Sequence, residues 1–120
     1  MPHVILKTAA AMDSIRDEFV PQSWQFNGIH VKADELFQSA QTGSLLVEAY
    51  IREEPLAQRV GLTIHEREPG QFIIGLHELG FPRPTLGVHF AIKSLAGWLA
   101  GLHAGAEIMT HNLNPKVAAA

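Results

Sequence analysis

Histidine is the residue type that first suggests chemistry, since the chain of 120 residues contains seven. A metal site needs several neutral imidazoles or carboxylates that converge on one point. Within "HERE" and "HELG" an acid follows His65 and His77 directly, and adjacent side chains on a strand point to opposite faces. A metal site would therefore join His65 and His77 of two neighbouring strands, aided by His30 from a nearby strand. The alternative is that all three are solvated or hydrogen-bonded surface histidines.

A second candidate site is the segment "PRPTLG", in which Arg83 lies between two prolines just before a long apolar stretch. Thr85 is a good N-cap, and the first N–H groups of the helix that follows attract anions. An arginine adds a planar fork suited to a phosphate or carboxylate. We expect a small anionic ligand at Arg83, Thr85 and Gly87. The alternative is a rigid connector into the helix.

The third candidate is Pro2, which would become an N-terminal secondary amine on removal of Met1. "MPHVILKT" resembles the first strand of the tautomerase superfamily, and "IHVKADELF" is loosely similar to a later one. It implies a small trimeric α+β enzyme with Pro2 as general base. The chain departs from that pattern, since a short helix and a three-stranded meander replace the full helix and second β-α-β unit that the family has.

Composition excludes several other classes of site. The chain has no cysteine, so it has no disulfide, thiolate ligand or cysteine nucleophile, and a cytoplasmic location is expected. The nine Lys and Arg residues are scattered and the net charge is −3, which indicates no nucleic-acid partner. No cofactor motif is present. No membrane span is expected either, because Lys93, two histidines and four glycines interrupt the apolar residues 85–106.

The periodicity of apolar residues predicts the elements. Strands are expected at residues 3–8, 28–32, 44–54, 59–68 and 71–79, and helices at 12–20, 33–43 and 85–106. The fold class is then α+β: an antiparallel sheet, made of a three-stranded meander plus N-terminal strands, packed by one long C-terminal helix. We expect a single domain over residues 1–113 and a flexible tail over residues 114–120.

The turn at residues 69–70, Pro-Gly, joins two of these strands in a hairpin whose register can be predicted. One buried face requires Leu62 and Ile64 to lie beside Ile74 and Leu76, so even-numbered residues must pair with even-numbered ones. A two-residue turn without a bulge would instead pair even-numbered residues with odd-numbered ones. The hairpin therefore requires a bulge or an extra residue near its turn.

The expected long helix has two stripes. Its apolar stripe, Val88, Ile92, Leu95, Leu99 and Leu102, would cover the sheet. Its second stripe places Gly97, Gly101 and Gly105 four residues apart, and glycines in a helix need a compensating close contact. We expect these glycines to form the interface of a homo-oligomer, most simply a dimer. The alternative is that the short N-terminal helices cover them.

The sequence thus favours a small cytoplasmic, homo-oligomeric α+β binding or accessory module that takes a small anionic ligand. Two alternatives stay open: a tautomerase-like or isomerase-like enzyme that uses Pro2, and a metal-binding protein that uses histidines.

Overall fold

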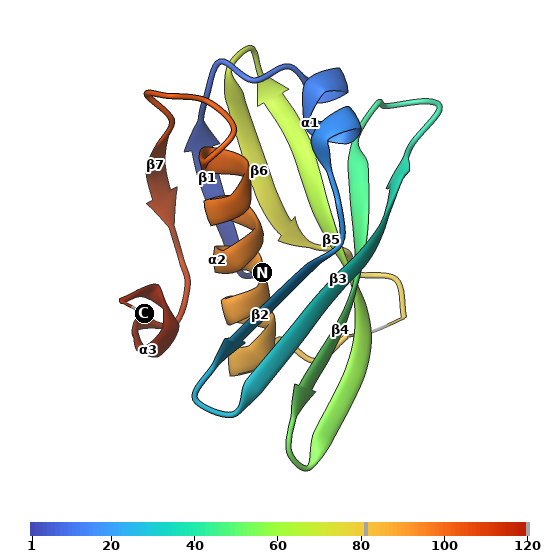
Figure 1. The fold of residues 1–120 in the computed structure, drawn as a ribbon, viewed down its shortest axis with the longest axis vertical. Helices are drawn as coiled ribbons and strands as arrows, with labels where there is room; N and C mark the ends of the chain where they lie inside the picture. Colours follow the sequence, from blue (N-terminus) through green and yellow to red (C-terminus); the bar gives the residue numbers. More distant parts are fainter. Residues whose placement is uncertain (81, 120) are drawn as a thin grey trace.

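The computed structural model describes residues 1–80 and 82–119, which form a seven-stranded sheet and three helices (Figure 1). The strands are β1 (His3–Lys7), β2 (Gln22–Phe26), β3 (Ile29–Gln38), β4 (Leu45–Glu53), β5 (Leu56–Glu68), β6 (Gln71–Leu76) and β7 (Glu107–His111). The helices are α1 (Met12–Glu18), α2 (Leu86–Ala100) and α3 (Pro115–Ala118). The sheet order is β2-β3-β4-β5-β6-β1-β7, and every pairing is antiparallel.

The core lies between the sheet and α2, which the curled sheet partly surrounds (Figure 1). The predicted stripe of α2 is confirmed for four of its members, since Val88, Ile92, Leu95 and Leu99 are fully buried. Odd-numbered residues of β4 and even-numbered residues of β5 and β6 face the helix, as their alternating burial shows. The opposite face of the sheet is therefore turned outward.

The predicted fold class is wrong in its balance of sheet and helix. The structure is rich in sheet, with seven strands in a curled half-barrel, and only one of its helices reaches 15 residues. The described residues contain no long C-terminal helix over 85–106: α2 begins at Leu86 as predicted but ends at Ala100, and β7 and α3 follow it. Thr85 caps α2, with its side chain accepting a hydrogen bond from the Val88 amide.

The predicted helix at residues 33–43 is also wrong, because most of this segment is the second half of β3. The pairing of β3 with β4 shifts register between Ala33 and Glu35, which breaks the alternation of the strand. Across the shift, Ala33, Leu36 and Phe37 have the i, i+3, i+4 spacing of an amphipathic helix. The bulge in β3 thus gave this part of the strand the pattern of apolar residues that is typical of a helix.

The predicted register of the β5–β6 hairpin is confirmed. Leu62 pairs with Leu76 and Ile64 with Ile74, and the ladder shifts at Arg67, just before the Pro-Gly turn. The bulge allows a tight turn and still keeps both apolar faces toward the core.

The chain ends near α2. Within residues 114–119, where a flexible tail was expected, α3 forms a helical turn whose Val117 is fully buried, and its carbonyl accepts a hydrogen bond from the Lys93 ammonium. Ala120, the last residue of that tail, lies outside the described residues. The single-domain division at residue 113 stays a prediction. In the part of the chain that the structure describes, none of the helices has the length and apolarity to cross a membrane.

Candidate functional site

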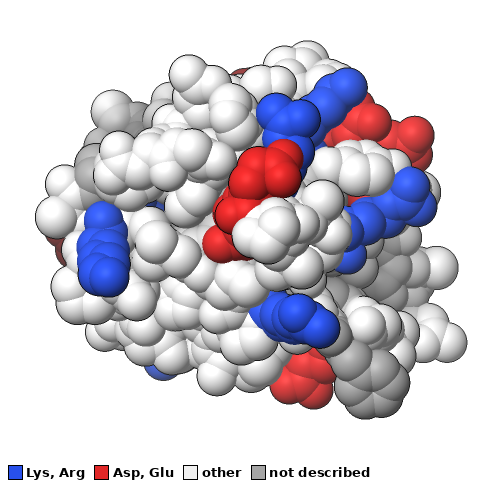
Figure 2. All heavy atoms as spheres, turned by 90° about the horizontal axis from the view of Figure 1, so that it is seen from below, with Lys and Arg blue, Asp and Glu red and all other residues white. Residues whose placement is uncertain are grey.

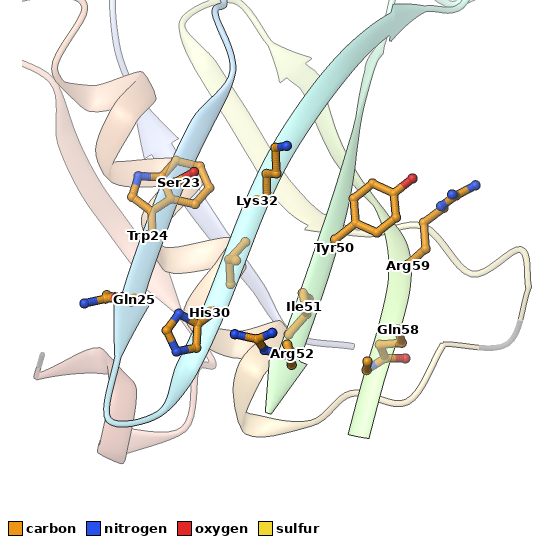
Figure 3. A pocket seen from close by; sticks show the side chains of 12 residues that line it. Ser23, Trp24, Gln25, His30, Lys32, Tyr50, Ile51, Arg52, Gln58 and Arg59 are labelled. Carbon is orange, nitrogen blue, oxygen red and sulfur yellow. The ribbon is translucent and has the colours of Figure 1, made fainter. Parts of the chain in front are cut away.

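A hollow of about 870 Å³ opens on the outward face of β2, β3, β4 and β5. Two cross-strand rows of residues form its walls (Figure 3). One row is Ser23, Lys32, Tyr50 and Arg59, and the other is Gln25, His30, Arg52 and Ala57. The row between them, which includes Val31 and Ile51, points its side chains to the core, so the floor lies at the level of the strands.

Strand geometry sets the dimensions of this hollow. Residues two apart on a strand are about 7 Å apart, which is the spacing of the two walls. Four neighbouring strands span about 14 Å, which is the length of the groove across the sheet. The site is thus a narrow trough that runs across the strands.

The trough is basic. Three of the nine Lys and Arg residues of the chain line it, namely Lys32, Arg52 and Arg59, and no acidic residue is among the lining residues that the structure describes. Lys32 and Arg59 belong to one wall and Arg52 to the other, so a bound anion would meet positive charge from both sides. Seen from the end where the β2–β3 and β4–β5 turns lie, most of the surface is uncharged, and basic and acidic side chains lie close together on one part of it (Figure 2).

Two acidic residues lie near the trough and offset part of its positive charge. Glu48 is 4.0 Å from Arg59, and Glu54 is 4.0 Å from Arg52. Both arginines are about 60% exposed, and exposed ion pairs of this length contribute little. Their guanidinium groups can therefore turn to a ligand phosphate at little cost.

An aromatic ring stands among these cations. The Arg59 guanidinium lies over the ring of Tyr50, 4.7 Å from its centroid, and Tyr50 remains 38% exposed. A cation held over a ring in this way is stabilised by the ring's quadrupole. The contact holds the flat ring of Tyr50 in place in one wall of the trough.

The predicted anion site at the start of α2 is occupied by a side chain of the protein itself. One carboxylate oxygen of Glu53 accepts a hydrogen bond from the Gly87 amide at 3.1 Å, and the other accepts one from the Thr85 hydroxyl. The main chain of Arg83 is fixed by Gln58, whose side-chain amide donates to the Arg83 carbonyl and accepts from its N–H. Binding of an added anion there stays a prediction, and such an anion would meet Glu53.

The structure does not bring the candidate metal ligands together into a group of three. His65 lies on β5 with its Nδ1 2.8 Å from the Ser44 hydroxyl, and the His77 Nδ1 accepts from the Leu79 amide at 3.1 Å. His30 lies apart from them in the basic trough. Among the described residues no group of three or more His, Cys, Asp and Glu side chains could hold an ion. A two-histidine site stays a prediction.

Pro2 is buried directly before β1, so removal of Met1 would place the new amine at a buried position. Its role as a base stays a prediction.

The three candidate interface glycines do not share one helix. Gly97 is exposed within α2, Gly101 is the residue after its last turn, and Gly105 lies beyond the helix with a positive φ of 82°. The flanks of α2 are covered in part by its own chain, since Phe19 packs edge-on against Trp98 at 5.5 Å. Self-association through these glycines stays a prediction.

Sequence reasoning did not identify the basic trough. The alternation in residues 45–52 does place Tyr50 and Arg52 on the outward face. Lys32 and Arg59 lie within predicted strands, but the register of those strands with β4 was not predicted. The strand that carries Ser23 and Gln25, β2, was not recognised. The signal that could have found β2 is the alternation of Trp24 and Phe26 between Pro21 and a turn at Gly28.

Comparison with known proteins gives one informative likeness. The chain is similar to the tRNA (guanine-N(7)-)-methyltransferase of Deinococcus radiodurans, with 29% identity over 108 residues. The alignment covers 84% of this chain but 31% of that protein, so the chain spans about a third of the length of the curated relative it matches. No family model matches the chain, and no solved structure shows significant similarity.

Proposed function

We propose that this chain is an accessory module that binds RNA through the basic trough of β2–β5. The observation that carries the proposal is the arrangement of Lys32, Arg52 and Arg59 on two facing walls with no acidic lining residue. The phosphate backbone supplies much of the affinity of a nucleic acid for a protein, and lysine and arginine are its usual partners. We therefore propose that the anion bound in the trough is the phosphate backbone of a nucleic acid.

The likeness to a tRNA methyltransferase supports RNA over other anions, because that protein's name identifies tRNA as its substrate. We propose that the part of this chain in such a methylation reaction is to bind the RNA. Nucleotide cofactors are commonly bound at the carboxyl ends of parallel strands, next to a glycine-rich loop. Every strand pairing described here is antiparallel, and the sequence has no glycine-rich phosphate loop.

The proposal departs from the expectation of no nucleic-acid partner, and the fold supplies the reason. Lys32, Arg52 and Arg59 are separated by many residues in the sequence, so no basic cluster is visible there. Pairing of β3 with β4 and of β4 with β5 brings them onto one face. The absence of cysteine is in keeping with a reducing compartment, and we extend the proposal to a cytoplasmic protein.

The test is fluorescence anisotropy with a labelled RNA of mixed sequence and about 12 nucleotides, a length within the range that single modules bind. A triple variant, K32A/R52A/R59A, should weaken binding by about tenfold or more at low salt. The matched control is K7A/R67A/K116A, which removes three exposed cations outside the trough and changes net charge equally. Equal affinity of the two variants would overturn the proposal, because only net charge would then matter.

A further inference from the structure

We infer that the trough takes an unpaired RNA strand and that Tyr50 is the platform on which one base stacks. This inference rests on the proposed function and names the form of RNA that the site selects. The trough holds charge for phosphates and an aromatic ring for a base, and these are the two components of sites for single strands.

The dimensions of the trough support a single strand. Its walls are two rows about 7 Å apart, and its floor lies at the level of the strands. The hollow, of about 870 Å³, has room for nucleotides of one strand. A double helix is much wider and would touch only the tops of the walls, and its bases, stacked inside the duplex, could not lie on the Tyr50 ring in one of these walls.

The position of Tyr50 supports stacking. On β5, Arg59 covers the ring at 4.7 Å, and on β3 the residue opposite Tyr50 is Lys32. The ring is thus flanked by the cations that would hold the phosphates on either side of a base. Base and aromatic stacking is tolerant of sequence, because every base has a flat face. The site should therefore bind unpaired RNA with little preference among bases.

Tyr50 is the only tyrosine in the chain, which makes it a direct reporter. In protein labelled only on tyrosine, the ring protons of Tyr50 should move upfield when unpaired RNA is added, since a stacked base shields them. Tripolyphosphate carries the charge without a base, and it should compete for the trough without that upfield shift.

Two variants separate stacking from general packing. Tyr50→Phe keeps the ring and should bind unpaired RNA within about twofold of the parent chain, whereas Tyr50→Leu should weaken binding about tenfold. Tyr50 is partly exposed, so both variants should remain folded. The parent chain should also bind the unpaired RNA more tightly than the same RNA annealed to its complement.

The outcomes are distinguishable. Equal affinity for paired and unpaired RNA, a Tyr50→Leu variant that binds as the parent does, or an unshifted Tyr50 ring would each overturn this inference and leave RNA binding intact. A parent chain that binds neither form would instead overturn the proposed function.

Discussion

The carboxylate of Glu53, at the end of β4, caps the first turn of α2 by accepting hydrogen bonds from the Gly87 amide and the Thr85 hydroxyl. The first N–H groups of a helix have no partner within the helix, and they carry partial positive charge. A residue 34 positions away supplies the negative group that they need. The contact fixes α2 to β4, one of the strands that form the basic trough.

Loss of this carboxylate should destabilise the fold. We expect Glu53→Ala to lower the free energy of unfolding by about 1 kcal/mol, since both the cap and a favourable charge at the helix start are removed. Glu53→Gln keeps an acceptor without the charge and should cost less. Urea denaturation followed by circular dichroism gives both values. A Glu53→Ala variant as stable as the parent would mean that the observed cap has no energetic role.

The close approach of β4 to α2 makes Gly87 intolerant of any side chain. A Cβ at this position would lie 2.6 Å from the Ile51 Cγ2 and would also overlap the Glu53 carboxylate. We expect Gly87→Ala to cost about 2 kcal/mol, as overpacking of a core does.

Gly97 provides the matched control, because it is in the same helix and a Cβ there meets nothing within 4 Å. Gly97→Ala should raise the free energy of unfolding by up to about 1 kcal/mol through helix propensity alone. Denaturation curves of the two variants would contradict this account if they shifted in the same direction.

Acid should loosen the contact between α2 and the segment that leads into α3. The His89 Nδ1 accepts a hydrogen bond from the Asn114 amide at 2.9 Å, which requires that nitrogen to be unprotonated. Burial, and to a lesser degree the positive N-terminus, hold the pKa of His89 below its usual value of 6.5. The unfolded chain then binds a proton more readily than the folded chain, so this contribution to stability is present above pH 6.5 and is lost as the pH falls through the lowered pKa.

Nuclear magnetic resonance titration of the His89 ring measures that pKa directly. The protection factor of the Asn114 amide against hydrogen exchange should fall at the same pH. A His89→Gln variant carries an acceptor that does not titrate, so its stability should fall less between about pH 7 and about pH 5. A His89 pKa above 6.5 would contradict the prediction.

The elements that the sequence predicted correctly are those whose signals are local. The Thr85 cap, the β4 alternation and the bulge at Arg67 each follow from a few adjacent residues and one buried face. The errors arose where local signals conflict with the fold. The β3 bulge imitates a helix, and the glycine-rich end of the apolar stretch was assigned to α2 although the helix ends at Ala100.

The candidate site could be predicted only in fragments. Tyr50 and Arg52 share a face by simple alternation, but Lys32 and Arg59 join them only through strand pairing. Pairing depends on contacts between residues distant in sequence, which no local pattern records. The start of α2 was predicted to attract an anion, and a negative group does lie there. It is the carboxylate of Glu53, which reaches Gly87 only through a contact between residues distant in sequence.

The salt dependence of RNA binding tests the central claim most directly. Each phosphate neutralised on a single strand contributes about 0.7 to the slope of log affinity against log salt concentration. The parent chain should therefore have a slope steeper than that of K32A/R52A/R59A by about 2, and K7A/R67A/K116A should keep the parent's slope. If K32A/R52A/R59A also keeps the parent's slope, its three cations do not contact the RNA backbone and the proposed site is wrong.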